Sequence, residues 1–161
     1  DEIEIVLIAH NKPNIGIIQH AEDFNIPNYL LTKENFLLSD EFIQHLIHLK
    51  VNWIILAGFL WKIPAALCQK FENKIINIHP SLLPAFPGLE AWKQALEAGV
   101  PTAGCTVHFV DGGMDTGEIL AQSEVPVLAG DTAASLHARI QVAEHELYPR
   151  VLARFADREL P

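Results

Sequence analysis

The stretch KIINIHPSLLPAFP, from Lys74 to Pro87, constrains the fold of this chain more than any other. Its apolar start is typical of a buried strand, and Pro80 ends that strand because proline cannot donate a hydrogen bond to a neighbour. Asn77 and His79 stand two residues apart, so both side chains point to one face. Ligands bind at the carboxyl ends of parallel strands. The pair therefore indicates a functional site or, equally well, a polar strand end that hydrogen-bonds to a neighbouring loop.

Composition limits the classes of protein to which the chain can belong. It has 161 residues, half of them hydrophobic, which is enough for one domain with a sizeable core. Its 20 acidic and 11 basic residues give a formal charge of −9. This balance argues against nucleic acid or a membrane as a partner, because both need clustered lysine and arginine or a long apolar span. Cys68 and Cys105 lie in apolar segments, as reduced thiols of a cytoplasmic protein do.

Apolar periodicity predicts a single domain over residues 1–161 in which strands alternate with helices. The predicted strands lie at residues 2–8, near 29–31, and at 53–57, 74–78, 103–110 and 118–127, and the predicted helices at 14–22, 40–49, after Pro64, at 89–98 and after Asp131. The continuous apolar run at 53–57 indicates a strand that is covered on both faces.

Local signals predict where the two main helices begin and which faces they bury. Ser39 is expected to cap the helix at 40–49 and Asp131 the final helix. Pro149 is expected to kink or end that final helix. Helical spacing predicts two buried stripes. They are Phe42, Leu46 and Leu49 in the first of these helices and Leu136, Ile140, Ala143 and Leu147 in the last.

The last third of the chain differs from the rest. The strands at 103–110 and 118–127 are joined by the short turn DGGMDTG, which has too few residues for a crossover, so the pair should be antiparallel. We therefore predict an α/β, Rossmann-like fold: a mostly parallel sheet with helices on both faces and an antiparallel C-terminal strand pair. The chain has no G-x-G-x-x-G sequence, so a bound dinucleotide is not supported.

The same turn contributes a third polar candidate, Asp115. Gly112, Gly113 and Gly117 surround it, and glycine allows the backbone to approach a ligand closely. Taken alone, Asp115 is more often an ordinary turn aspartate than a functional residue.

Three stretches of the chain resemble the phosphoribosylglycinamide formyltransferases, which use formyltetrahydrofolate. They are NIHPSLLPAFPGLEAWKQALEAG, GCTVHFVDGGMDTGEILAQ and VPVLAGDT with EHELYP, and the resemblance extends over about residues 3–152. It implies transfer of a formyl group from 10-formyltetrahydrofolate to the amine of glycinamide ribonucleotide in purine biosynthesis, without a metal. It also implies that Asn77, His79 and Asp115 form the catalytic trio.

This trio suits the chemistry of formyl transfer. Attack of an amine on the formyl carbon creates a negative oxygen, and each donor aimed at that oxygen is worth on the order of 3 kcal/mol in a dry site. The amide of Asn77 and a protonated His79 are the candidate donors. Asp115 is expected to pair with His79 and to relay protons from the amine to the departing folate nitrogen, directly or through a water.

The resemblance implies contacts with both substrates. The segment 56–64 matches the loop that lines the pterin pocket, and the turn after residue 109 should close that pocket, although core packing explains Phe59 equally well. Pro80, Gln141 and Glu144 are assigned to the ribonucleotide. His108 matches a family histidine, but we favour a strand histidine with satisfied hydrogen bonds. The residues assigned to the folate are Phe59, Leu60, Trp61, Ile63, Val110, Asp111, Gly112, Gly113 and Met114.

The chain also departs from the family pattern. The family begins with a further strand and a glycine-rich loop that cradles the substrate phosphate at a helix N-terminus. That unit is absent from the chain, so we expect an incomplete form with weak phosphate binding, little activity and two open edges within its sheet. Lys33 and Asn35 stand where the family has an arginine near the phosphate. Glu90 occupies a position that is often histidine.

Several alternatives remain open from the sequence. Methionyl-tRNA formyltransferase has a similar strand end and turn but an added basic domain, and a formyltetrahydrofolate hydrolase would replace the amine with water. A folate-binding module without catalysis is another possibility. A metal site of His79, His108 and Asp115 is disfavoured, because the chain has no H-E-x-x-H or C-x-x-C framework. A monomer and a homodimer are both compatible with the sequence.

Overall fold

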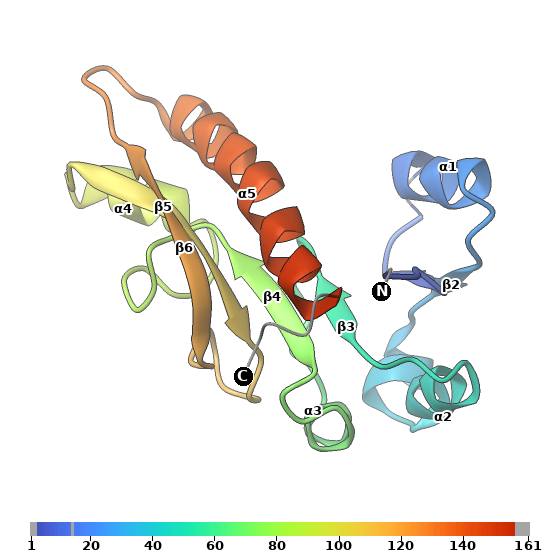
Figure 1. Cartoon of the computed structure of the whole chain (residues 1–161). Coiled ribbons are helices and arrows are strands. Elements are labelled where there is room, and N and C mark those ends of the chain that lie inside the picture. The colour runs from blue at the N-terminus through green and yellow to red at the C-terminus, as the bar shows by residue number, and fades with distance from the viewer. Residues whose placement is uncertain (1–2, 14, 157–161) are drawn as a thin grey trace.

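A computed structural model describes residues 3–13 and 15–156 of the chain (Figure 1). Helices and strands alternate along most of it, as predicted. The strands are β1 (Ile8–His10), β2 (Asn28–Leu30), β3 (Ile54–Leu56), β4 (Ile75–His79), β5 (Thr102–Phe109) and β6 (Ile119–Pro126), and the helices are α1 (Ile15–Asp23), the π-helical turn η1 (Lys33–Leu37), α2 (Glu41–His48), α3 (Ala65–Lys70), α4 (Ala91–Glu97) and α5 (Ala133–Ala156). None of the helices in the described part has the length and apolar character needed to cross a membrane.

The strands form two separate sheets. The larger sheet has the order β3-β4-β5-β6, and β1 pairs with β2 in a second, two-stranded sheet. The pairs β1–β2 and β3–β4 are parallel, whereas β4–β5 and β5–β6 are antiparallel. In Figure 1 the segment from β1 to α2 lies to one side of the larger sheet, beyond β3. The α/β class and the antiparallel C-terminal pair are confirmed.

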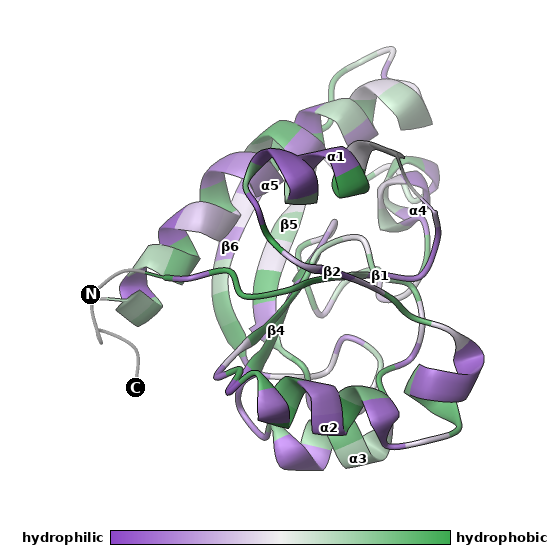
Figure 2. Cartoon of the chain, turned by 90° about the vertical axis from the view of Figure 1, so that its right-hand side faces the viewer, coloured by the Kyte–Doolittle hydropathy of each residue, from purple (hydrophilic) through white to green (hydrophobic). Residues whose placement is uncertain are grey.

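Helices cover both faces of the larger sheet, and each face has its own core. Ile76, Cys105 and Val107 pack on one face with Leu136 and Ile140 of α5. On the opposite face, Ile75 packs with residues of α2, α3 and η1. In Figure 2, α2 and α5 show hydrophobic and hydrophilic residues side by side, as helices with one buried face do. Each fully buried aliphatic side chain contributes about 1.5–3 kcal/mol.

The first and third predicted strands are shorter or less covered than expected. Residues 3–7 are not in a strand, and β1 begins only at Ile8, because β2 offers hydrogen-bond partners to three residues alone. Residues 1 and 2 lie outside the described part. The prediction that the strand at 53–57 is covered on both faces is wrong, since Ile55 remains 40% exposed. Ile54 and Leu56 pack in the core that contains Ile75 and residues of α2, α3 and η1. Successive side chains of a strand point to opposite faces, so Ile55 points to the other face.

The helix caps also differ in part from the predictions. Asp40 precedes α2 and makes no side-chain cap, while Ser39 Oγ accepts a long 3.4 Å bond from Glu41 N–H. At α5 the capping residue is Thr132 and not Asp131. Thr132 directly precedes α5, and its Oγ1 accepts from Ser135 N–H at 3.1 Å. The Asp131 carboxylate instead accepts from the Ser135 hydroxyl at 2.8 Å and from the Arg139 guanidinium at 2.9 Å.

Both predicted stripes are buried, but Pro149 does not end α5. Leu136, Ile140 and Leu147 are buried and Ala143 is partly buried; in α2, Phe42 and Leu46 are buried and Leu49 is half-buried. The helix continues beyond Pro149 to Ala156. Buried residues on either side of the proline hold the helix against the sheet, and the Tyr148 hydroxyl donates to the carbonyl of Leu56 at 2.8 Å.

Candidate active site

Strand register brings the predicted polar residues to one face of the sheet. In the antiparallel pair β4–β5, Asn77 lies opposite His108 and His79 lies opposite Thr106. Side chains that oppose one another across two strands share a face. The loop between β5 and β6 then carries Asp115 to the same place. The convergence of Asn77, His79 and Asp115, which come from distant parts of the chain, is thus observed.

Asp115 lies at the centre of this cluster. Its Oδ2 accepts a 2.8 Å hydrogen bond from the Gly88 N–H and lies 3.4 Å from His79 Nδ1. Its Oδ1 lies 3.8 Å from His108 Nε2. The backbone of Asp115 is left-handed, with φ +55°, a conformation that non-glycine residues adopt mainly where the surrounding structure imposes it. One carboxylate therefore faces two buried imidazoles.

The loop that carries Asp115 is tied together by Asp111. Its Oδ1 accepts hydrogen bonds from Gly113 N–H at 3.0 Å and from the Thr116 hydroxyl at 2.9 Å. These bonds hold the pKa of Asp111 below its ordinary value. Gly117 follows, and a Cβ there would stand 1.7 Å from the Phe109 carbonyl oxygen. Only glycine fits at this point without a shift of the backbone.

A backbone carbonyl determines which nitrogen of His79 carries the proton. His79 Nε2 lies 2.9 Å from the carbonyl oxygen of Phe86. A carbonyl only accepts hydrogen bonds, so Nε2 must donate. Neutral His79 is therefore the Nε2–H tautomer, and any proton that it gains or loses is on Nδ1. That nitrogen is the one that faces Asp115.

His108 links Asn77 to the same cluster. Its Nδ1 donates to the Phe109 carbonyl at 2.7 Å, and its Nε2 lies 3.4 Å from Asn77 Nδ2. Burial lowers the pKa of His108, so the ring is neutral and its Nε2 accepts from the Asn77 amide. The second N–H of that amide has no other partner in the described part of the chain. Both nitrogens of His108 are engaged, as expected for a strand histidine, and it also orients Asn77.

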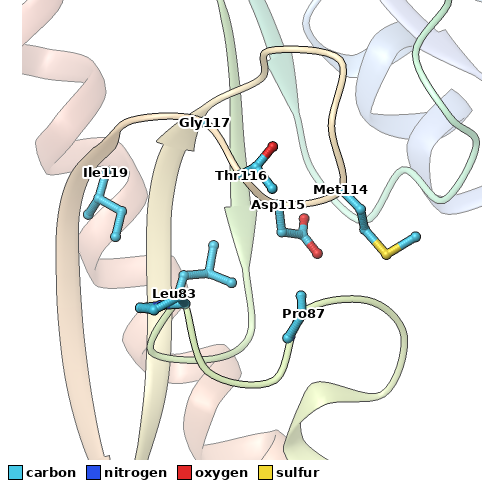
Figure 3. Close-up of a pocket in the computed structure, with 8 residues that line it drawn as sticks. Leu83, Pro87, Met114, Asp115, Thr116, Gly117 and Ile119 are labelled. Atoms are coloured by element: carbon cyan, nitrogen blue, oxygen red, sulfur yellow. The ribbon is translucent and has the colours of Figure 1, made fainter.

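A hollow of about 280 Å³ lies against Asp115 (Figure 3). Its walls are largely apolar, and they come from the loop after β4 and from the Asp115 loop. The side chain of Asp115 points toward Pro87, with Met114 beside it. The lining residues are Leu83, Pro84, Pro87, Met114, Asp115, Thr116, Gly117 and Ile119. None of the residues assigned to the folate from the segment 56–64 is among them.

The segment predicted to line a pterin pocket does not present its side chains to one surface. Ile63 is buried in the core, and Leu60 is 70% exposed. The rings of Phe59 and Trp61 pack against Phe36, with centroids 5.5 and 6.1 Å apart. Val110 continues the sheet, since its N–H donates to Ile75 O at 2.9 Å. Any contact of Ile63 with a ligand would involve its backbone.

The residues assigned to the ribonucleotide do not lie on one face of the sheet. Pro80 follows His79 directly, whereas Gln141 and Glu144 are on α5, which packs on the face opposite the trio. Burial raises the pKa of the half-buried Glu144. Burial and the charge of Glu144 together raise the pKa of Cys105 to about 11.

Sequence reasoning missed the groups that hold the trio in place. These are the Phe86 carbonyl, the Gly88 N–H and the side chains of Thr106 and Gln122. The Phe86 carbonyl and the Gly88 N–H are backbone groups, and every residue type carries both except proline, which lacks the N–H, so the sequence had no signal for either. The alternative metal site finds no support, because no group of three or more histidine, cysteine or acidic side chains within residues 3–13 and 15–156 is arranged to hold an ion.

Comparison with known proteins places the chain in a family. Residues 1–152 match the family model described as "Formyl transferase". The chain belongs to the formyl transferase family. It is 43% identical over 150 residues to the phosphoribosylglycinamide formyltransferase of Bacillus subtilis (strain 168), covering 91% of this chain and 77% of that protein. Over 161 residues it is 43% identical to the trifunctional purine biosynthetic protein adenosine-3 of Drosophila pseudoobscura pseudoobscura.

The length covered differs greatly between these relatives. The match with the Drosophila protein takes in 98% of this chain but only 12% of that protein. A crystal structure of phosphoribosylglycinamide formyltransferase from Anaplasma phagocytophilum superposes with a TM-score of 0.92 at 37% identity. That alignment covers 98% of this chain and 77% of the other. The formyl transferase fold is therefore shared along nearly all of the chain.

Proposed function

We propose that this formyl transferase moves the formyl group of 10-formyltetrahydrofolate to the amine of glycinamide ribonucleotide in purine biosynthesis. The observation that carries the proposal is the convergence of Asn77, His79 and Asp115 in a chain 43% identical to a phosphoribosylglycinamide formyltransferase. An amide donor, an imidazole and a carboxylate are the groups that acyl transfer between two nitrogens requires.

The proposed reaction needs one bond to form and one to break. The substrate amine attacks the formyl carbon, a C–N bond forms, and the carbonyl electron pair moves onto oxygen. The free N–H of Asn77 and a protonated His79 stabilise that oxygen. Because His79 Nε2 is held by the Phe86 carbonyl, the proton that His79 offers is on Nδ1, beside Asp115. The intermediate then collapses and the folate nitrogen leaves.

In this scheme Asp115 carries a proton from the attacking amine to the departing folate nitrogen. The attacking amine loses one proton and the departing folate nitrogen gains one. The carboxylate of Asp115 accepts the first proton and returns it, directly or through a water. The 3.4 Å separation of its Oδ2 from His79 Nδ1 is longer than a strong charged hydrogen bond but leaves no room for an atom between them, so a reacting group would approach both side chains from one side.

The remaining contacts follow the family pattern. The folate would lie along the segment from Phe59 to Ile63 and the turn from Val110 to Met114. The ribonucleotide would contact Pro80, Gln141 and Glu144. The co-substrate would be 10-formyltetrahydrofolate, with no metal. We propose that the protein acts on these small molecules in the cytoplasm, as a monomer or homodimer, without a nucleic acid or membrane partner.

We also propose that a further strand–loop–helix unit completes the domain formed by residues 1–161. Among the described residues β3 pairs only with β4, and β1 only with β2. The side chains of Trp53 and Ile55 are 37% and 40% exposed at this open edge. A strand inserted between β1 and β3 would join the two sheets, and its loop would hold the substrate phosphate.

An acceptor assay on the full-length protein tests the proposed function. The protein is given 10-formyltetrahydrofolate with glycinamide ribonucleotide, with initiator methionyl-tRNA, or with water alone, and loss of the formyl group is followed. We expect formylation of the ribonucleotide and no reaction of the other two acceptors. Formylation of the tRNA, or hydrolysis that the ribonucleotide does not alter, would overturn the proposal. Tight folate binding without any transfer would indicate a binding module.

A further inference from the structure

The hydroxyl of Thr106 is the centre of a buried hydrogen-bond network next to the trio. Thr106 lies opposite His79 across β4–β5 and is fully buried. Its Oγ1 donates to Ser81 O at 2.6 Å and accepts from Leu83 N–H at 3.0 Å and from Gln122 Nε2 at 3.0 Å. A hydroxyl has one donor and two acceptor positions, so every position on this one is used.

The network holds the turn that follows β4. Gln122 Nε2 also donates to the Leu83 carbonyl at 2.8 Å, and the Ser81 hydroxyl donates to the Ala85 carbonyl at 2.6 Å. The side chains of Thr106 in β5 and Gln122 in β6 thus bind the turn after β4, mostly through its backbone groups. If the Thr106 hydroxyl were removed, the buried Ser81 carbonyl and Leu83 N–H would each lose a hydrogen-bond partner, and an unpaired buried polar group is destabilising.

The same turn then returns to the active site. Phe86 and Gly88 follow Leu83 along the chain, and the backbone of each contacts a residue of the trio. The Phe86 carbonyl accepts from His79 Nε2 at 2.9 Å, and the Gly88 N–H donates to Asp115 Oδ2 at 2.8 Å. Thr106 and Gln122 therefore hold the backbone segment whose Phe86 carbonyl fixes the His79 tautomer and whose Gly88 N–H binds the Asp115 carboxylate.

We propose that Thr106, assisted by Gln122, is the positioning residue of this site. It places the Phe86 carbonyl so that His79 keeps its proton on Nε2 and presents Nδ1 to Asp115. The inference rests on the proposed function for its catalytic consequence. Without the hydroxyl, the turn shifts, Nε2 loses its acceptor, and the neutral ring populates both tautomers. Turnover then falls while the folate segment at 59–63 is untouched.

The test compares Thr106→Val, which keeps the shape and removes the hydroxyl, with Thr106→Ser, which restores the hydroxyl. Gln122→Met removes the second donor at an exposed position, where loss of folding is not expected. Thr102→Val makes the same change at the start of the same strand. The full-length variants are examined by ¹⁵N NMR of the histidine rings and by steady-state kinetics.

We expect Thr106→Val to lower kcat roughly 10–100-fold, the range for a slightly misplaced catalytic group, with the KM for the folate within a few-fold of wild type. Neutral His79 should change from the Nε2–H signature to a mixture of tautomers. Gln122→Met should show the same changes to a smaller degree, whereas Thr106→Ser and Thr102→Val should resemble wild type.

Wild-type ring signals together with wild-type kcat in folded Thr106→Val would overturn the inference. If Thr106→Val does not fold by circular dichroism, Gln122→Met decides in its place: an unchanged tautomer there has the same meaning. The two proposals fail separately. A wild-type protein that formylates no acceptor would remove the proposed function, whereas the NMR signature of His79 would still report on the role of Thr106.

Discussion

At the scale of single residues, the site depends on which atoms carry protons. The Phe86 carbonyl holds one proton on His79 Nε2, and the Phe109 carbonyl holds one on His108 Nδ1. Each ring is left with a single nitrogen that faces Asp115 or Asn77. Burial lowers the pKa of His108 and so keeps it an acceptor for the Asn77 amide. The two histidines therefore have different roles although they lie side by side.

Replacing Asp115 should damage turnover and spare binding. Asp115→Asn removes the group that we propose relays protons, and general acid–base catalysis is worth roughly 10²–10⁴-fold in rate. We expect kcat to fall by about that factor and folate affinity to stay within a few-fold, as measured by steady-state kinetics and equilibrium binding. Glu118→Gln, at an exposed carboxylate in the same loop, is the control and should be active. Equal loss of folate affinity in Asp115→Asn would show that the carboxylate positions the folate instead.

Replacing Glu144 should stabilise the protein at neutral pH. Burial raises the pKa of Glu144 above its ordinary value of 4.5, so the fold favours its neutral form. The stability that Glu144 contributes is fully present below pH 4.5 and is lost as pH rises through the folded pKa. Glu144→Gln stays neutral, so its Tm should exceed that of wild type at pH 7 by a few degrees and match it near pH 4.

Calorimetry across this pH range checks the Glu144 prediction. Glu146→Gln, on the same helix but at an exposed carboxylate, should shift Tm little at either pH. A Glu144→Gln variant less stable than wild type at pH 7 would contradict the argument, because it would mean that the charged carboxylate is favoured in the fold. If Glu144 also contacts the ribonucleotide, as proposed, the stabler variant should have a higher KM for that substrate.

At the scale of elements, α5 shows how packing overrides a local signal. Proline in a helix interior lacks an N–H donor and crowds the preceding turn, yet α5 extends beyond Pro149 to Ala156. Leu147, Tyr148 and Val151 are all buried against the sheet. Their burial outweighs the loss of one helical hydrogen bond, so tertiary packing and not helix propensity determines where α5 ends.

The proline should nevertheless lower the stability of α5. Pro149 is exposed, so its ring contributes little packing that alanine would lose. Pro149→Ala restores a helical N–H donor and should raise the free energy of unfolding by about 1–3 kcal/mol, up to the full helix-propensity difference, as measured by urea denaturation. Arg150→Ala, also exposed, is the matched control. No gain, or a loss, would mean that the proline limits the unfolded chain more than it strains the helix.

At the scale of the whole molecule, the division into two sheets is the main structural feature. Ile54 N–H donates to the carbonyl of Lys74, the residue before β4, so the N–H of Ile55 points away from β4, toward the side where β1 and β2 lie. Open strand edges are usually covered in folded proteins. Among residues 3–13 and 15–156, no strand pairs with that edge of β3.

Amide hydrogen exchange should detect this edge. In the 161-residue chain, we expect the Ile55 amide to exchange at least about tenfold faster than the Ile76 amide in the adjacent strand, because local opening is easiest at unpaired edges. In the full-length protein, the Ile55 amide should become protected while Ile76 changes little. Equal protection of Ile55 in both proteins would contradict the proposed strand between β1 and β3.

The sequence by itself determined the alternation of strands and helices, the antiparallel C-terminal pair and the shared face of Asn77 and His79. These features follow from side-chain periodicity and loop length, which act over a few residues. The residues of the trio were found partly in this way and partly from resemblance to a family.

Only the tertiary structure decided how that trio is held. The Phe86 carbonyl, the Gly88 N–H and the buried hydroxyl of Thr106 take part because the chain returns to β4 after a turn. Such partners are backbone groups or common polar residues, and nothing in their local sequence distinguishes them. The exposure of Ile55 and the path of α5 beyond Pro149 were decided in the same way, because burial depends on which distant elements pack against a segment.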